Sequence, residues 1–440
     1  MSKQPVVVFW FRRDLRLNDN HGLFQALQSR YPVLPVFIFD KNILDALPRT
    51  DKRVSFIYEA LTQLNESLMK AGSSLFAIHE RPLSAFETLC SMFEVKEVIT
   101  NHDYEPYAIK RDQQVSDFLA SENIKFRSFK DQVIFERSEI VKSDGSPYTV
   151  FTPYSKKWKY KEKGQSASHY DCARFFEHLI KTESFPFPSL QEIGFRISDN
   201  KIERPVIDEE RIAVYDKTRD IPYLDGTTRL SVHLRFGTVS IRQLVRVANE
   251  LNQQWLNELI WREFFMMILF HFPRVVSESF KKEYDNIQWR NNEKEFKAWC
   301  DGTTGYPIVD AGMRELNETG FMHNRVRMIV ASFLTRHLLI DWRWGEAYFA
   351  EKLADYELSS NNGNWQWAAG CGCDAVPYFR IFNPSLQVKR FDPQLLYIKK
   401  WIPHFDSYHS KPIVEHEFAR KRALAVYSAA LKHSKVGIKW

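Results

Sequence analysis

Residues 6–11 of the chain read VVVFWF, an unbroken apolar run close to the first residue. Three strand-like runs follow it: VLPVFIF at 33–39, SLFAIHE at 74–80 and KEVIT at 96–100. Segments with helical periodicity separate these runs, and this alternation is typical of a parallel sheet with helices on both faces. The pattern predicts a doubly wound, Rossmann-like α/β domain over residues 1–135.

The first loop of this domain lacks the signature of a nucleotide site. It reads FRRDLRLNDNHG at 11–22 and contains no G-x-G-x-x-G sequence. Those glycines let a Rossmann loop approach a pyrophosphate closely. We therefore do not expect a dinucleotide to bind this half of the chain in the usual Rossmann way.

The composition indicates a globular protein with two domains. At 440 residues the chain exceeds the size at which one core usually stops growing, and 44% of its residues are hydrophobic. The net charge of +6 favours a polyanionic partner only mildly, because 61 basic residues stand against 55 acidic ones. Five cysteines without framework spacing indicate a reducing compartment, and the sequence contains no recognisable secretion signal or membrane span. A cytoplasmic protein is expected.

The rest of the chain has a different pattern. Residues 136–204 are rich in Ser, Pro, Lys and Tyr and have weak periodicity, which predicts an inter-domain linker. Helical patterns dominate residues 205–440, as in LNQQWLNELIWREFFMMILF at 251–270 and HNRVRMIVASFLTRHLL at 323–339. The sequence therefore predicts an all-helical C-terminal domain.

The most informative stretch for function is SSNNGNWQWAAGCGCDAVPYFRIFNP at 359–384. It combines amides, glycines and indoles, which suit a flat redox cofactor, where a hydrolase would place a nucleophile and a base. On the helix at 251–270, Glu258 lies three residues from Trp261 and four from Arg262, so the three side chains share one surface. An intrahelical salt bridge beside a packed indole explains that spacing equally well.

Other patterns carry less information. Cys371 and Cys373 form a C-x-C without a second pair of ligands, so no metal is expected. The run YSKKWKYKEK at 154–163 could contact phosphates, and a solvated linker explains it as well. Neither G-x-S-x-G nor a Walker loop is present.

Six ordered motifs together resemble one family. They are WFRRDLRLNDN at 10–20, DGTTRLS at 225–231, WLNELIWREFF at 255–265, TGYPIVDAGMREL at 304–316, FMHNRVRMIVASFL at 321–334 and IDWRWGEAYF at 340–349. The chain resembles the photolyase/cryptochrome flavoproteins nearly end to end, and most closely the class I cyclobutane-pyrimidine-dimer DNA photolyases. The resemblance implies an α/β domain joined by a long linker to a helical FAD domain, as predicted above.

The resemblance also implies an activity, in which excited reduced FAD passes an electron to a flipped-out dimer in DNA, the cyclobutane ring splits and the electron returns. Such an enzyme is a deoxyribodipyrimidine photo-lyase. The family's FAD contacts fall on these residues of the chain: Tyr215, Thr227, Thr228, Arg229, Leu230, Ser231, Trp255, Glu258, Arg262, Asn324, Arg327, Asp355, Glu357, Asn361 and Asn362.

The same resemblance assigns residues to the chemistry and to the substrate. Asn361 matches the position that faces the flavin N5, and Glu258 matches the one that hydrogen-bonds the dimer. Three indoles match the relay that returns oxidised flavin to its reduced form, namely Trp365, Trp342 and Trp289. The family's lesion and DNA contacts fall on Arg219, Trp261, Asn324, Arg325, Met328, Trp367 and Arg380.

Some positions depart from the family pattern and leave alternatives open. Phe321 replaces a common Trp and Asn364 a common Gly, so a blue-light-sensing cryptochrome is the alternative to a repair enzyme. Folate-binding members have Asn-Glu where this chain has Tyr107-Ala108, which argues against a folate antenna. A deazaflavin, another flavin or no antenna are the remaining choices. We expect a monomer that binds damaged DNA and requires neither a membrane nor a protein partner.

Overall fold

The computed structural model describes residues 3–164, 169–407 and 411–436. The chain divides into two compact units, each made of three segments. Unit 1 comprises Met1–Glu136, Lys161–Ile207 and Arg229–Glu250. Unit 2 comprises Arg137–Tyr160, Asp208–Thr228 and Leu251–Trp440. Each unit is described by itself below.

Unit 1 is built on a five-stranded parallel sheet with the strand order β3-β2-β1-β4-β5. Its elements are β1 (Pro5–Phe11), α1 (His21–Leu27), β2 (Val33–Asp40), α2 (Lys41–Leu44), α3 (Lys52–Lys70), β3 (Phe76–Glu80), α4 (Pro82–Met92), β4 (Glu94–Asn101), α5 (Pro106–Ser121), β5 (Lys125–Phe129), η1 (Cys172–His178), α9 (Ser231–Phe236) and α10 (Ile241–Leu251). The α/β fold class is confirmed.

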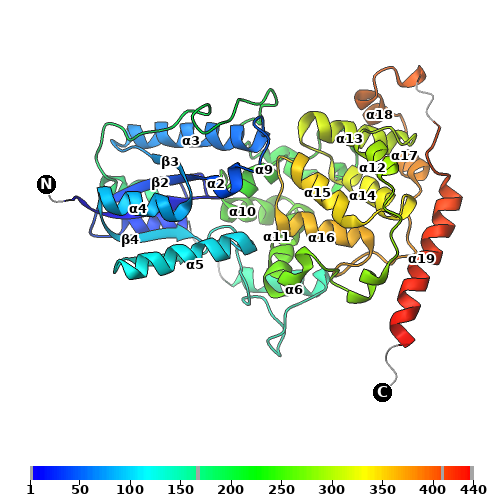
Figure 1. Cartoon of the computed structure of the whole chain (residues 1–440), viewed down its shortest axis with the longest axis horizontal. Helices are drawn as coiled ribbons and strands as arrows, with labels where there is room; N and C mark the ends of the chain where they lie inside the picture. Colours follow the sequence, from blue (N-terminus) through cyan, green and yellow to red (C-terminus); the bar gives the residue numbers. More distant parts are fainter. Residues whose placement is uncertain (1–2, 165–168, 408–410, 437–440) are drawn as a thin grey trace. The chain divides into compact units, whose positions relative to one another are not determined.

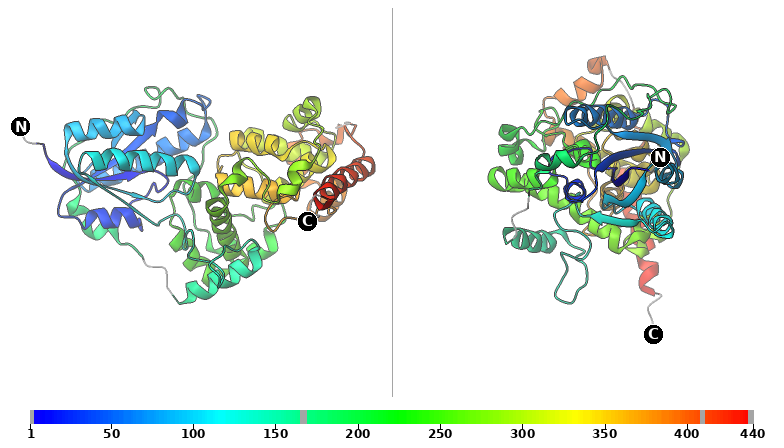
Figure 2. Two further views of the ribbon diagram at one scale, coloured as in Figure 1. Left: turned by 60° about the horizontal axis from the view of Figure 1, so that its bottom comes forward. Right: turned by 90° about the vertical axis from the view of Figure 1, so that its left-hand side faces the viewer.

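Alternate residues of β1 serve two separate cores, because successive side chains of a strand point to opposite faces. Val7, Phe9 and Phe11 pack with residues of α1 and α3. Val6, Val8 and Trp10 pack with residues of α4 and α5 on the other face. Figure 1 and the right-hand view of Figure 2 show α3 and α5 on opposite sides of the sheet. A strand buried on both faces has no polar positions, which explains the unbroken apolar run.

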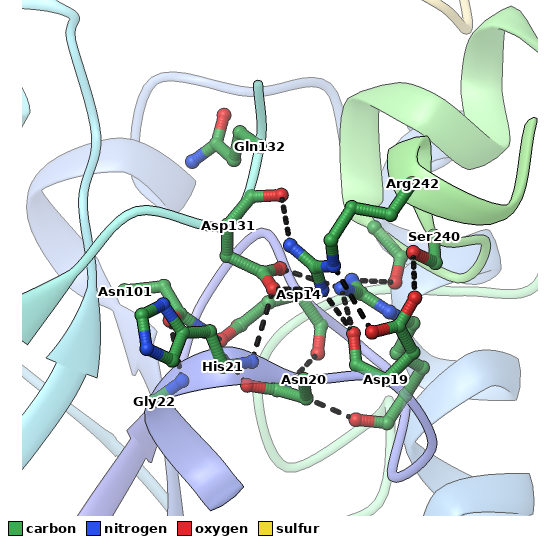
Figure 3. Close-up of polar contacts among 12 residues, drawn as sticks. Asp14, Asp19, Asn20, His21, Gly22, Asn101, Asp131, Gln132, Ser240 and Arg242 are labelled. Carbon is green, nitrogen blue, oxygen red and sulfur yellow. Dashed lines mark hydrogen bonds and ion pairs between the residues drawn. The ribbon is translucent and has the colours of Figure 1, made fainter. Parts of the chain in front are cut away.

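A buried polar network ties the loop after β1 to α10 within unit 1 (Figure 3). Asp131 accepts hydrogen bonds from Arg242 at 2.8 Å and from Arg16 at 2.7 Å, and Asp19 accepts one from the Nε of Arg242 at 3.0 Å. Burial alone would raise the pKa of Asp131, but Arg16 and Arg242 outweigh it and lower the pKa to about 2. Asp131, Asp19, Arg16 and Arg242 are thus all paired, as buried charges require.

Unit 2 is helical. Its elements are α7 (Glu209–Ala213), α8 (Tyr215–Thr218), α11 (Gln253–His271), η2 (Pro273–Val276), η3 (Lys282–Asn286), α12 (Glu293–Cys300), α13 (Pro307–Thr319), α14 (Asn324–Ser332), the π-helical turn η4 (Phe333–His337), α15 (Trp342–Lys352), α16 (Leu358–Ala369), α17 (Pro384–Phe391), α18 (Leu396–Trp401), η5 (Phe405–Ser407) and α19 (His416–Val436). One further helix, α6 (Phe151–Lys163), runs across the border between the units.

Close packing of α16 in unit 2 depends on two glycines. A Cβ on Gly363 of α16 would lie 2.2 Å from the ring of Phe265 on α11. A Cβ on Gly345 of α15 would lie 2.2 Å from the indole of Trp365 on α16. Real Cβ atoms do not approach other atoms that closely, so both helix contacts require glycine.

The four predicted strand segments are confirmed as β1 to β4. The fifth strand, β5, was missed because its sequence KFRSF has two phenylalanines without strand periodicity among polar residues, and none of its residues is buried. The long helical patterns at 251–270 and 323–339 correspond to α11 and to α14 with η4. The predicted domain and linker boundaries at 135 and 204 stay predictions. No helix within the described ranges combines the length and apolar character needed to cross a membrane.

Candidate functional site

The predicted catalytic carboxylate, Glu258, lies in a cluster of predicted cofactor and DNA residues of unit 2. It projects from α11, forms a close ion pair with Arg219 and accepts a 2.9 Å hydrogen bond from Gln254. The guanidinium of Arg219 lies over the ring of Tyr215, 5.7 Å from its centre. Burial raises the pKa of Tyr215, and the Glu258 carboxylate adds to the rise. The phenol therefore stays neutral beside an ion pair.

Arg325, a predicted DNA contact, extends this cluster. It donates to Asp220 at 2.7 Å, and Asp220 also lies 3.7 Å from Arg219. Its guanidinium stacks over Phe391 with 4.4 Å to the ring centre. Asp220 thereby links the two arginines and fixes their positions before any phosphate is bound.

Two ion pairs connect further predicted cofactor residues. Arg262 of α11 contacts Glu357, the N-cap residue of α16, at 3.1 Å. Arg327 of α14 contacts Asp355 at 2.9 Å and donates to the backbone oxygen of Met322. The side chains of Glu357 and Asp355 are 6% and 8% exposed, so both acids depend on these arginines to balance their burial.

The adjacent asparagines of α16 have different surroundings. Asn362 is fully engaged inside the protein, because it donates to the Val275 oxygen at 2.9 Å and accepts from Gln366 at 3.1 Å. Asn361 donates twice to Glu346, and among the described residues no donor reaches its Oδ1. Asn364 is exposed and donates to the Ser360 oxygen of its own helix. Of the two adjacent asparagines, only Asn361 therefore has an acceptor that no described residue occupies.

The two indoles predicted to flank the lesion differ in their contacts. Trp261 is half-buried and stacks on Phe151, with 3.7 Å between ring centres and 5° between planes. It also contacts Phe265 at 5.5 Å. Trp367 is half-buried and borders the large core of unit 2. Stacking on Phe151 holds the Trp261 ring rigid, which suits a surface that receives a flat base.

The three indoles of the predicted relay all belong to unit 2, but the ring contacts join them to other aromatic residues. Trp365 is buried and contacts Trp299 at 6.1 Å between ring centres. Trp342 is buried, and its Nε1 has no hydrogen-bond partner among the described residues. Trp289 is half-buried and contacts Tyr427 at 5.9 Å. The relay itself stays a prediction.

The remaining predicted residues are partly dispersed. Trp255 is buried on α11, Met328 is half-buried and receives a contact from Arg325, and Asn324 and Arg380 are exposed. The predicted FAD contacts at 227–231 are divided between the units: Thr227 and Thr228 belong to unit 2, and the other three residues to unit 1, namely Arg229, Leu230 and Ser231. Whether these five residues converge on one ligand stays a prediction.

Comparison with known proteins decides the family. Residues 7–170 match the model described as DNA photolyase, and residues 255–433 match the FAD binding domain of DNA photolyase. The deoxyribodipyrimidine photo-lyase of Halobacterium salinarum is 37% identical, over 96% of this chain and 99% of that protein. The chain belongs to the DNA photolyase family. The resemblance seen in the six motifs is thereby confirmed, and so is the presence of the family's FAD-binding domain.

Two solved photolyases share this fold along nearly the whole chain. A bacterial class III photolyase from Agrobacterium tumefaciens is 34% identical, covers 98% of both chains and has a TM-score of 0.86. An archaeal photolyase from Sulfolobus tokodaii, solved with two FAD molecules, is 33% identical, covers 96% of this chain and 100% of its own, and has a TM-score of 0.82.

The residues of unit 2 fit a flavin in the chemistry that they offer. In the described parts of the chain no donor occupies the Asn361 acceptor, and Arg262 and Arg327 present guanidinium groups that are already held in place. Flavin proteins tune the cofactor through hydrogen bonds to the ring nitrogens, which such groups can supply. No group of three or more potential metal ligands occurs in the described parts of the chain.

Sequence reasoning missed three residues that support the site. Glu346 holds the Asn361 amide, Phe151 supports Trp261, and Trp299 contacts Trp365. Glu346 lies inside the motif IDWRWGEAYF, which carried the resemblance, but nothing in its spacing linked it to α16. Phe151 is more than a hundred residues from Trp261, so no local pattern could have paired them.

Proposed function

We propose that this protein is a light-driven DNA repair enzyme that splits cyclobutane pyrimidine dimers. Membership of the DNA photolyase family supports the reaction class, and the relatives that match along the whole chain are named deoxyribodipyrimidine photo-lyases. When bound, reduced FAD supplies the excited electron that opens the cyclobutane ring, and the electron returns to it. Binding of the DNA, placement of the dimer and stabilisation of its charge must come from this chain's residues.

The observation that carries the proposal is the cluster of Glu258, Arg219 and Tyr215. It joins a predicted catalytic residue, a DNA contact and a cofactor contact through direct contacts. The Glu258 side chain is 30% exposed, so one face of the carboxylate is accessible to a ligand. Glu258 is placed to hydrogen-bond the carbonyl edge of the dimer and to stabilise the charge that develops there.

Binding of the lesion requires that the damaged pair leave the DNA helix, and photolyases belong to the base-flipping enzymes. Trp261 provides a rigid aromatic surface because Phe151 supports its other face. Trp367 is proposed as the second indole of the pocket. Both rings are half-buried, so each can still gain contact area from a base.

The three arginines are proposed to bind DNA phosphates in different ways. Arg219 and Arg325 are held by acids and serve as preset contacts. Arg380 is exposed and has no ion-pair partner within the described ranges, so it adds an uncompensated charge. Guanidinium groups bind phosphate through paired hydrogen bonds, which position the duplex without reading its sequence.

The proposed activity is tested with purified protein that contains reduced FAD and an oligonucleotide that carries one thymine dimer. Loss of the dimer under blue light, and none in the dark, is expected. Glu258→Ala should retain FAD and repair fewer dimers per absorbed photon. We further propose that the enzyme is cytoplasmic and acts as a monomer. Size-exclusion chromatography with light scattering tests the monomeric state.

A further inference from the structure

The orientation of the Asn361 amide is determined by its partner. Its Nδ2 donates to the backbone oxygen of Glu346 at 3.0 Å and to the carboxylate Oε1 of Glu346 at 2.8 Å. Both atoms are acceptors, so only the NH₂ end of the amide can face them. Reversal would set the amide oxygen against two oxygens. The carbonyl Oδ1 must therefore point away from Glu346.

The packing of α15 against α16 makes this contact possible. The two helices lie side by side in Figure 1. Gly345 meets the indole of Trp365, and Trp365 lies four residues after Asn361 on the same face of α16. Because Gly345 has no side chain, the backbone of Glu346 comes within hydrogen-bond distance of α16. The contact is thus built into the helix interface.

The neighbouring asparagine shows that the free acceptor is specific to Asn361. The Oδ1 of Asn362 accepts from Gln366, so its whole amide is used inside the protein. The Oδ1 of Asn361 has no such donor among the described residues. Glu346 is half-buried, and burial raises its pKa while the bond from Asn361 opposes the rise.

We infer that Glu346 is a positioning residue that presents the Asn361 oxygen, and not the nitrogen, to the flavin N5. The inference rests on the proposed function, in which Asn361 faces that atom. Reduced flavin carries a hydrogen on N5 and donates it, whereas oxidised flavin has a lone pair there. An oxygen fixed in this place favours the reduced form and disfavours the oxidised form. Glu346 thereby stabilises the redox state that repair requires.

Glu346→Gln tests the inference, because glutamine has nearly the same size and can donate a hydrogen bond. Its NH₂ group can then donate to the amide oxygen of Asn361, so the Asn361 amide can turn its nitrogen toward N5 and gives up only its bond to the backbone oxygen of residue 346. Glu346→Leu removes the side-chain acceptor altogether. Glu351→Gln is the matched control, since Glu351 lies on the same helix, is exposed and, among the described residues, has Lys352 as the hydrogen-bond partner of its side chain.

The measurement is the two-electron midpoint potential of bound FAD, obtained by equilibration with a reference dye. Each Glu346 variant should lose roughly tenfold in preference for reduced flavin, which lowers the potential by about 30 mV. Glu351→Gln should leave it unchanged. FAD content and melting temperature, measured on the same samples, should stay near wild type, which separates a positioning role from a structural one.

The possible failures are distinguishable. In the first case, wild-type protein binds FAD and repairs dimers, but both Glu346 variants change the preference for reduced flavin less than twofold. The positioning role is then wrong and the proposed function stands. If wild-type protein binds FAD and repairs no dimers while the variants shift the potential as expected, the positioning role stands alone. If wild-type protein binds no FAD, both are wrong.

Discussion

Replacement of Asp131 by Asn should destabilise unit 1 markedly, because its carboxylate joins two buried arginines (Figure 3). The Asp131 side chain is 1% exposed, and the pKa falls from 3.8 to about 2 in the fold. That difference corresponds to about 2.5 kcal/mol of preference for the charged form. Arg16 and Arg242 keep other acceptors, namely Gly237 and Asp19. We therefore expect a loss of about 2–4 kcal/mol, near the lower end for broken buried pairs.

The assay is hydrogen exchange of the β1 amides, read by mass spectrometry on wild type and Asp131→Asn. The folded pKa lies below the unfolded one, so the carboxylate's contribution is complete above pH 3.8 and is lost as the pH falls through about 2. The difference between the two proteins should shrink over that range. Asp301→Asn, which removes an exposed pair with Lys297 in unit 2, should leave the exchange of the β1 amides unchanged. A cost below about 1 kcal/mol for Asp131→Asn would show that pairing of this carboxylate with Arg16 and Arg242 does not stabilise unit 1.

Three further predictions concern the site and the acid stability of unit 2. Glu258→Ala should keep FAD but lower the number of dimers repaired per absorbed photon, and an unchanged quantum yield would remove its proposed role. Trp342→Phe should slow photoreduction of oxidised flavin and leave repair intact once the flavin is reduced chemically; loss of repair under that condition would contradict the relay. Burial lowers the pKa of His323 to about 4 and that of His337 to about 3. Both folded pKa values lie below the unfolded value of 6.5, so the free energy of unfolding should fall as the pH drops from 6.5 to 4. The loss should be about 3 kcal/mol for His323. Urea titrations of His323→Asn, which keeps a capping side chain, should show a flatter pH dependence.

The sheet was largely predictable, because burial on both faces leaves a direct record in the sequence. β1 has no polar residue in its buried positions, and its six apolar residues stand out at once. β5 has only one neighbouring strand and is half-exposed, so KFRSF carries no comparable signal. Local pattern thus reports burial: the other edge strand, β3, has two buried residues and was recognised, whereas β5 has none.

The site was predictable only where its residues share an element. The spacing of Glu258 and Arg262 on α11 placed both on one surface, but their ion partners are Arg219 and Glu357, which come from other segments. The alternative of an intrahelical Glu258–Arg262 salt bridge is therefore wrong. Partners of that kind depend on tertiary packing, which periodicity does not encode.

The adjacent asparagines of α16, Asn361 and Asn362, make the same point at the level of single atoms. The sequence presents Asn361 and Asn362 as equivalent amides, and the resemblance assigns both to the cofactor. In the structure Asn362 forms hydrogen bonds with Val275 and Gln366, whereas Asn361 forms them with Glu346. Only the packing of α15 on α16 distinguishes them, and it depends on a glycine whose importance no local pattern reveals.

The most direct test of the account is repair by the purified protein with chemically reduced FAD. Oligonucleotides that carry either one cyclobutane thymine dimer or one (6-4) lesion are illuminated with blue light and analysed by chromatography. A cyclobutane-dimer photolyase should restore the cyclobutane dimer to two thymines only in the light, while the (6-4) lesion persists. Light-induced flavin changes without restoration of the dimer would contradict it and favour a blue-light sensor.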